Sequence, residues 1–281
     1  MTEGCSPDSG WFTGVSPDSP EDAIAAIRDG SAETVRAWPE LAVESGFADS
    51  EADYYDALHE ATMAATRAAV REAETADDRQ LIHIVRAMDD CERVANELAE
   101  RVAEWAGSKR DDAETGVSYA KSLAEEDADG ADGALVSLAR RVRDLDDETE
   151  ALRAHVERTA PEVAPNLSSL AGPVLAARLI ALAGGLKELA RKPAGTVQVL
   201  GAEEALFAHL RGHAPSPKHG VIFVHEAIQG TAPEHRGSAA RALSGKLAIA
   251  ARVDHYSGER KPELKAELDG RIGRIRGRDT E

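Results

Sequence analysis

The sequence predicts a mainly α-helical protein, with a short N-terminal region, a long antiparallel coiled-coil hairpin and a globular helical C-terminal domain. Three observations support this fold class. Aromatic residues make up only 4% of the chain, which favours helices packed through Ala, Leu and Val. Two stretches carry heptad patterns, and glycines interrupt a later apolar stretch at fixed places. We expect the three parts at residues 1–50, 51–160 and 161–281.

The sequence of the N-terminal third predicts two helices. Ser19 is a suitable N-cap, Pro20 fits the first helical position and Gly30 follows the end, so we expect a short helix over about 20–29. From Glu51 to about Arg79 the sequence is rich in Ala, Glu and Arg and contains no Gly or Pro. This composition predicts a long helix that leads directly into the next one.

Two heptad seams follow, each with apolar residues at alternating spacings of 3 and 4. The first consists of Leu81, Ile84, Met88, Cys91, Ala95, Leu98, Val102 and Trp105. The second consists of Leu135, Leu138, Val142, Leu145, Thr149, Leu152 and Val156. The polar, glycine-containing residues 106–134 lie between them, so we expect an antiparallel hairpin with this segment as its tip. Residues 119–123 are expected to add a further helical turn there.

The glycine at position 201 occupies a special place in the C-terminal part. It follows residues 196–200, which read as extended, and precedes Glu203 and an apolar helix. Glycine lets a backbone approach a ligand, and free amides at a helix N-terminus suit a phosphate. A plain strand-to-helix cap, with acids matching the helix dipole, is the structural alternative.

Basic side chains cluster after this point. Arg and Lys make charge-assisted contacts to phosphate, and His or Arg stacks on unpaired bases, so the cluster favours RNA contact. The alternative is a solvated face, with Arg241 or Lys246 in an internal salt bridge. A last helix is expected near the C-terminus, with Leu264, Leu268, Ile272 and Ile275 on its packed side, or else a frayed tail. The basic cluster consists of Arg211, His213, Lys218, His219, Arg236, Arg241, Lys246 and Arg252.

Charge is divided unevenly along the chain. The net charge is −18, but residues 166–281 hold 17 Lys and Arg against 12 Asp and Glu, a net +5. The acidic part is interpreted as solvated surface and the basic part as an RNA-facing one. The 33 cations comprise 25 Arg and 8 Lys, and this bias with the acidic surface suggests a host with a salt-rich cytoplasm, such as a haloarchaeon.

Several function classes find little support. The two cysteines, Cys5 and Cys91, form neither a disulfide framework nor a metal-binding pair, which fits a reducing cytoplasm. No secretion signal or membrane segment is indicated. His209 and His213 have the spacing of zinc ligands, but no cysteine lies nearby and His225 lacks the second histidine of a zinc-protease motif. We expect no metal, no cofactor and no catalytic residue.

Four segments in order resemble the Nop domain. The family includes the scaffold protein of archaeal box C/D ribonucleoproteins, its eukaryotic nucleolar counterparts and a spliceosomal factor. The resemblance covers residues 81 to about 255, with Glu204 where the family's GAEK motif has lysine. The segments are residues 164–186, 192–210, 217–223 and 236–254.

The resemblance implies a noncatalytic scaffold of a box C/D guide RNA–protein complex. Such a scaffold binds kink-turn RNA together with a ribosomal-protein-like subunit and positions fibrillarin for ribose 2′-O-methylation of rRNA or tRNA. The residues expected to face RNA are Gln198, Gly201, Ala202, Glu203, Arg211, Lys218, His219, Arg236, Arg241, Lys246 and Arg252. The resemblance also implies a homodimer through the hairpin, whose expected coiled-coil residues are Leu81, Ile84, Met88, Cys91, Leu98, Val102, Trp105, Leu138, Val142, Leu145 and Leu152.

Family members usually begin with a larger α/β domain that binds fibrillarin. No run of alternating strands is evident before Phe47, so a reduced N-terminal region is expected, with residues 11–47 as the fibrillarin-binding part. A coiled-coil interaction adaptor, whose Nop-like half no longer binds RNA, is the alternative function. A hydrolase or metalloenzyme comes third.

Overall fold

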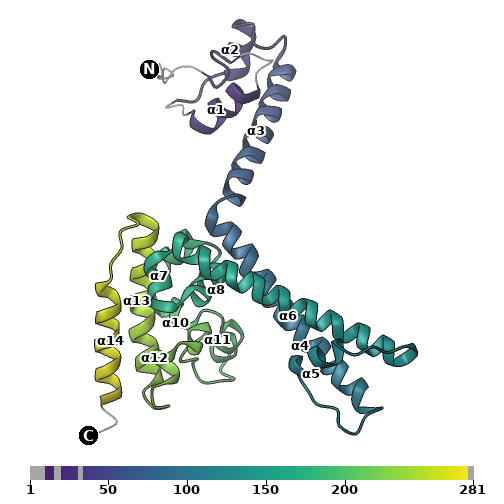
Figure 1. Ribbon diagram of the computed structural model, residues 1–281. Helices are drawn as coiled ribbons and strands as arrows, with labels where there is room; N and C mark the ends of the chain where they lie inside the picture. Colours follow the sequence, from purple (N-terminus) through teal and green to yellow (C-terminus); the bar gives the residue numbers. More distant parts are fainter. Residues whose placement is uncertain (1–9, 16–19, 31–33, 278–281) are drawn as a thin grey trace. The chain divides into compact units, whose positions relative to one another are not determined.

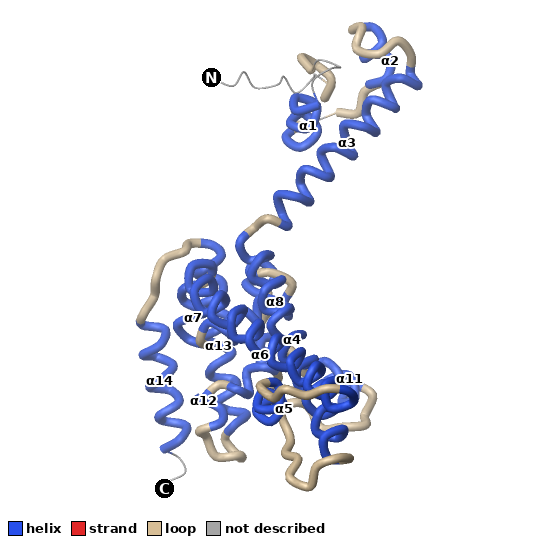
Figure 2. The backbone as a smooth tube through the Cα atoms, turned by 45° about the vertical axis from the view of Figure 1, so that its right-hand side comes forward, coloured by secondary structure: helices blue, strands red, loops and turns tan. Residues whose placement is uncertain are grey.

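The computed structural model describes residues 10–15, 20–30 and 34–277, and the expected N-cap Ser19 lies outside them. All regular elements of these described residues are helices, and none is a strand (Figure 2), which confirms the mainly α-helical prediction. The chain forms two compact units, Met1–Ala76 and Asp77–Glu281. The limits predicted for its domains stay predictions.

The described residues of the first unit form three helices and a small aromatic cluster. Helix α1 (Pro20–Asp29) lies where the sequence predicted it, and α2 (Trp38–Glu44) and α3 (Glu51–Glu74) follow. Phe12 and Tyr54 are buried, with ring centroids 5.9 Å apart, and Trp11 and Phe47 pack beside them. Both α1 and α2 contact α3, so the residues on either side of Phe47 fold as one unit.

The expected continuous helix from Glu51 to Arg79 is wrong. Helix α3 ends at Glu74, and the Thr75 hydroxyl donates to the Arg71 carbonyl oxygen at 3.0 Å. A new helix begins at Asp77. Asp77 and Asp78 stand in the first turn of the new helix, where acidic side chains suit the positive end of the helix dipole, which gives the break a local cause.

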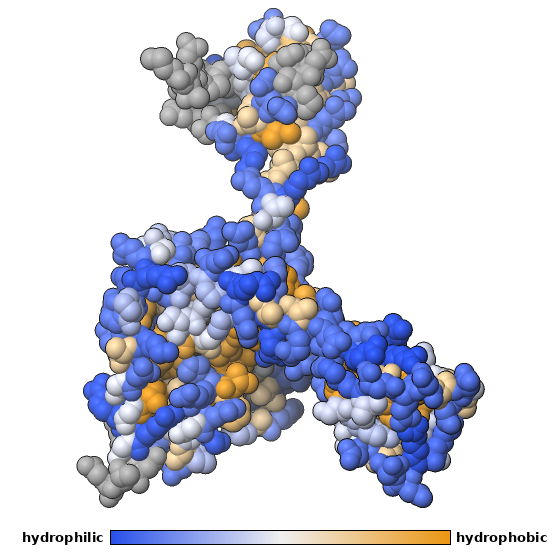
Figure 3. Space-filling view, in the orientation of Figure 1, coloured by the Kyte–Doolittle hydropathy of each residue, from blue (hydrophilic) through white to orange (hydrophobic). Residues whose placement is uncertain are grey.

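An antiparallel hairpin opens the second unit (Figure 1). Helix α4 (Asp77–Gly107) packs along α6 (Gly130–Val163), and α5 (Val117–Ala124) packs on both near the tip, as predicted. Leu81 at the start of α4 shares a core with Val156 near the end of α6, whereas Val102 shares another with Leu135, so the helices run in opposite directions. The surface of the hairpin in Figure 3 is largely hydrophilic.

The two predicted seams are buried unevenly. In each helix one heptad position is fully buried and the other is half-buried. In α4 the buried stripe also includes Ile82 and Val85, which belong to the core shared with α8 (Pro173–Ala183). The fully buried positions are Leu81, Met88, Ala95, Val102, Leu135, Val142, Thr149 and Val156. The half-buried positions, here called the outer seam, are Ile84, Cys91, Leu98, Trp105, Leu138, Leu145 and Leu152.

The remaining helices form a globular module at the base of the hairpin. Helix α13 (Arg236–Tyr256) runs through it and contacts five other α-helices. Helix α14 packs through Leu264, Leu268, Ile272 and Ile275, as predicted. The other elements are α7 (Pro165–Ala171), α8 (Pro173–Ala183), α9 (Leu186–Arg191), α10 (Ala194–Val199), α11 (Glu203–Leu210), η1 (Val221–Val224), α12 (Glu226–Gln229) and α14 (Glu263–Arg276).

Among the described residues, no single helix is long and apolar enough to cross a membrane, although the pair α7 and α8, bent by 116°, passes by length and composition.

A polar network ties α7 to the end of α13. Asp254 accepts hydrogen bonds from the backbone N–H groups of Asn166 (3.0 Å) and Leu167 (2.8 Å). The Asn166 side chain, only 5% exposed, donates to Asp254 and to the Glu259 carbonyl and accepts from the Lys261 N–H. The carboxylate therefore satisfies the free amides that begin α7.

We predict that Asp254→Asn destabilises the protein by about 1–3 kcal/mol, because an amide group would turn a donor toward N–H groups that need an acceptor. Asp269→Asn, on an exposed position of α14, is the matched control and should change stability little. Denaturant unfolding at fixed salt checks both. Equal stability of the two variants would contradict this role of the network.

Candidate nucleic-acid interface

Two loops meet to build the candidate interface. The Gly220 N–H donates to the Gln198 carbonyl at 2.9 Å, and the Val221 N–H donates to the Leu200 carbonyl at 2.7 Å. Gln198 Nε2 also donates a hydrogen bond to the Lys218 carbonyl at 2.8 Å. A Cβ atom at position 220 would lie 2.0 Å from the Leu200 oxygen, so only glycine allows this approach.

The prediction that residues 196–200 are extended is wrong. These residues lie in helix α10 and the turn after it, so Gln198 is presented from a helix. Val197 is fully buried, and α10 packs against α13. The β-branched Thr196, Val197 and Val199 favour strand by propensity, but packing against α13 outweighs that preference.

A local hydrogen bond to a nearby side chain closes the turn at Gly201. Gly201 has a φ of 80°, and its N–H donates to Glu203 Oε1 at 2.9 Å. One of the backbone amides that the sequence suggested for phosphate binding is therefore already hydrogen-bonded to Glu203. The exposed Glu204 stands beside it in the first turn of α11.

Phe223 organises the basic residues of this surface. The His219 ring stacks on Phe223, with centroids 4.4 Å apart and planes 20° apart. The guanidinium carbon of Arg236 lies 5.6 Å from the centroid of the same ring, in cation–π range, while Arg236 Nε donates to the Thr231 carbonyl at 3.2 Å. Sequence reasoning missed Phe223 as a site residue, although it ends the matched segment 217–223.

Burial holds the pKa of His219 below its usual value, and the positive charges of Arg236 and Lys218 act in the same direction. At pH 7 the ring is therefore neutral and offers a flat aromatic face. Lys218 is exposed beside it and carries a positive charge. The surface can thus stack on a base and bind a phosphate at neighbouring points.

Some of the residues that were predicted to face RNA lie together in the structure, and others lie apart from them. Gln198, Gly201, Lys218, His219 and Arg236 lie together around the two loops, and with Phe223 we call them the loop surface. Ala202 and Glu203 begin α11 next to it. Arg211 is exposed after α11, and Arg241 is exposed on α13.

Two predicted cations have internal partners. Lys246 forms an ion pair with Glu267 of α14, and its side chain is only 18% exposed. Arg252 donates to the carbonyls of Ala190 (3.0 Å) and Lys192 (3.1 Å), where it satisfies the end of α9. Both residues lie outside the loop surface, and their contact with RNA stays a prediction.

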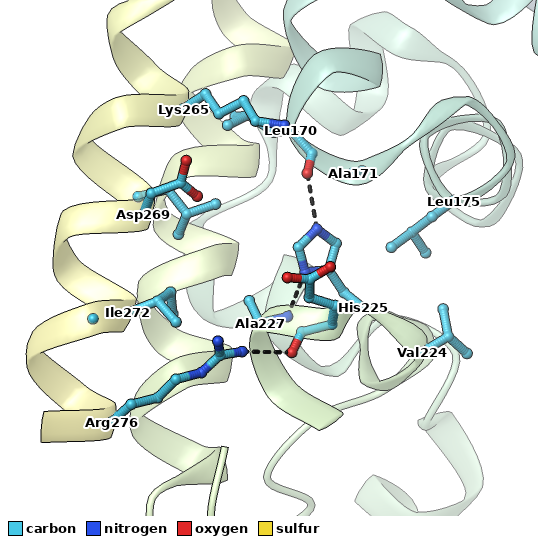
Figure 4. A pocket seen from close by; sticks show the side chains of 13 residues that line it. Leu170, Ala171, Leu175, Val224, His225, Ala227, Lys265, Asp269, Ile272 and Arg276 are labelled. Carbon is cyan, nitrogen blue, oxygen red and sulfur yellow. Dashed lines mark hydrogen bonds between the residues drawn. The ribbon is translucent and has the colours of Figure 1, made fainter. Parts of the chain in front are cut away.

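His225, one of the histidines considered for zinc, has a structural role (Figure 4). Its Nδ1 accepts the Ala227 N–H at 3.0 Å, so the proton sits on Nε2, which donates to the Leu170 carbonyl at 2.9 Å. Beside it, a groove of about 610 Å³ runs along α14, where Arg276 donates to the Glu226 carbonyl at 2.8 Å. Within the described part of the chain, no three metal-ligating side chains gather.

Helix α11 exposes apolar side chains beside the loop surface. None of its residues is buried, and Phe207 and Leu210 are 56% and 71% exposed.

Comparison with known proteins agrees with this architecture. Residues 72–274 match the Nop family, described as "snoRNA binding domain, fibrillarin". The chain is 33% identical over 271 residues to an uncharacterized NOP5 family protein of Methanocaldococcus jannaschii, covering 83% of this chain and 66% of that protein. It is 32% identical over 244 residues to probable nucleolar protein 5-2 of Arabidopsis thaliana, covering 72% of this chain and 46% of that protein.

A solved structure shares the fold. A chain in the crystal structure of the fibrillarin/Nop5p complex superposes with a TM-score of 0.54 at 23% identity, covering 92% of this chain and 93% of that one. The chain described here spans less than two thirds of the length of the two relatives above. The family match covers more than half of the chain and includes both the hairpin and the loop surface, so this protein belongs to the Nop family.

Proposed function

We propose that this protein is a noncatalytic scaffold of a box C/D guide RNA–protein complex. It binds a kink-turn RNA together with a ribosomal-protein-like subunit and holds fibrillarin, which supplies the chemistry of ribose 2′-O-methylation of rRNA or tRNA. The relatives named above and the family description support the assignment. The scaffold contributes positioning, and bond making belongs to the methyltransferase.

The loop surface carries this proposal. It combines an exposed cation, Lys218, with a neutral aromatic stack of His219 on Phe223 and the guanidinium of Arg236. Such a combination suits the phosphates and unpaired bases of an RNA loop or bulge. It lies in the half of the chain whose net charge is positive.

The partner protein is expected next to this surface. Phe207 and Leu210 on α11 are exposed apolar side chains, which suit a protein partner better than an RNA backbone. Glu204 stands at the start of the same helix, where it repels phosphate but can pair with a cation of the partner. We assign α11 to the kink-turn-binding subunit.

The other two parts are assigned to fibrillarin and to a second copy. The aromatic unit that contains Trp11 and Phe47 is the proposed fibrillarin-binding part. The outer seam of the hairpin leaves a row of apolar side chains half-buried, and a second copy would cover it. The acidic surface and the preference for Arg are consistent with a salt-rich host cytoplasm.

We predict that Lys218→Glu combined with Arg236→Glu prevents assembly on the kink-turn RNA–protein complex, because it places two negative charges against phosphate. A gel-shift or pull-down in about 2 M KCl measures this, since the Debye length is then only a few Å and short contacts alone remain. Lys187→Glu, exposed on α9, is the matched control with a single charge reversal.

Normal assembly of the double variant would contradict the RNA-scaffold proposal. It would favour the coiled-coil adaptor, which tolerates charge reversal on a surface that does not bind RNA. Circular dichroism of the double variant at the same salt shows whether it is folded.

Fibrillarin recruitment tests the second half of the proposal. We expect fibrillarin to bind the assembled complex of this chain, RNA and kink-turn-binding protein in about 2 M KCl. Co-elution on size exclusion with light scattering also gives the number of copies, and two chains of 29.9 kDa each are expected. If the RNA complex forms while fibrillarin stays free, the methylation role is contradicted and RNA binding is retained.

A further inference from the structure

Helix α8 carries one charged residue in an otherwise apolar sequence. Arg178 is that residue, and the rest of the helix is Pro, Val, Leu, Ile and Ala. Its guanidinium binds Asp89 of α4 through Nε at 3.0 Å and Nη2 at 2.5 Å, and lies 3.5 Å from Glu92. The Arg178 side chain is only 26% exposed, and several charge-assisted bonds hold this partly buried charge to the hairpin.

Two further contacts fix the same helices. Asp78 accepts the Leu186 N–H at the start of α9 at 2.9 Å, and Arg86 donates to the Ala181 carbonyl at 3.5 Å. Asp78 and Asp89 are eleven residues, about three helical turns, apart, so they lie on one face of α4. This face holds α8 and the start of α9 against the base of the hairpin.

The other end of α8 supports the loop surface. Leu182 lies one turn beyond Arg178, and a Cβ atom at Gly201 would lie 3.4 Å from Leu182 Cδ1 and 3.2 Å from the Val221 Cβ. The Gly201 turn therefore lies close to Val221 and to Leu182, whose side chain is 47% exposed. A cleft of about 680 Å³ is lined by residues of α4, α8 and both loops, with Arg86 and Phe223 among them. Helix α8 contacts both α4 and η1 and so bridges this cleft.

We propose that Arg178 is a positioning residue for RNA recognition. Its ion pair with Asp89 fixes α8 against the hairpin, and Leu182 then fixes the Gly201 turn and the bonds that join the two loops. Arg178 is thus one of the contacts that couple the hairpin to the loop surface, beside the Asp78 and Arg86 bonds and the shared apolar core. A binding site needs such support, because contacting groups must be held within about 0.5 Å of their productive positions. This inference rests on the proposed RNA-binding function.

The test compares Arg178→Gln and Asp89→Asn with Arg178→Lys, using the full chain and the reconstituted kink-turn RNA–protein complex. The first two variants should bind the complex roughly tenfold more weakly, and Arg178→Lys should bind better than Arg178→Gln. Arg153→Gln is the matched control: Arg153 also lies near Glu92, at 3.7 Å, but it belongs to α6 and should leave binding unchanged.

Hydrogen exchange separates positioning from general destabilisation. In Arg178→Gln the Gly220 and Val221 amides, which bond to Gln198 and Leu200, should exchange faster, while amides of α14 keep their rates. Unchanged exchange at Gly220 and Val221, or binding by Arg178→Gln equal to wild type, would overturn the inference. If the wild-type chain does not bind the complex at all, the proposed RNA-binding function is wrong. The exchange rates of the Gly220 and Val221 amides then decide alone whether Arg178 positions the two loops.

Discussion

The close packing of α13 against its neighbours is the constraint on which the rest of the C-terminal module depends. Its buried residues are mostly alanines, with Leu243 and Leu247 among them. Small side chains let the axes of neighbouring helices approach closely, so one central helix contacts α7, α9, α10, α12 and α14 together. Each of these helices is short and would not be stable alone, so α13 supplies the packing that makes them helical.

This central helix also explains where the loop surface lies. Helix α10 packs on α13 and carries Gln198, and η1, which contacts both helices, carries Phe223. Arg236 begins α13 itself and reaches the same aromatic ring. The loop surface therefore combines residues from three elements whose relative positions are fixed by one buried helix. Its remaining support comes from α8, which is held to the hairpin.

The sequence revealed long, strongly periodic elements and missed short ones whose form depends on tertiary contacts. The hairpin and the packed side of α14 follow from apolar spacing alone, since their repeats are long enough to specify a helix face. Residues 196–200 have β-branched side chains and read as extended, yet burial of Val197 makes them helical. The break after Glu74 contains no Gly or Pro, so composition does not reveal it.

The sequence predicted the kind of site, but only some of the residues that form it. Lys218, His219 and Arg236 stand out because they are basic residues near glycine and proline. Phe223 and Arg178 do not, because an aromatic residue and a lone arginine in apolar sequence resemble core and surface residues, respectively. The sequence left an internal salt bridge open for Arg241 or Lys246, and the fold gives it to Lys246. Arg252 looks the same in sequence as the exposed cations and has internal partners only in the fold.

Under the proposed function, a strongly acidic protein recognises RNA through a small basic and aromatic surface, so it needs a protein partner beside that surface. The direct measurement is the affinity of this chain for kink-turn RNA in about 2 M KCl, with and without the kink-turn-binding protein. The account predicts weak binding to RNA alone and binding tighter by roughly a hundredfold or more with the protein present. Tight binding to naked RNA at this salt, or no gain from the partner, would contradict it.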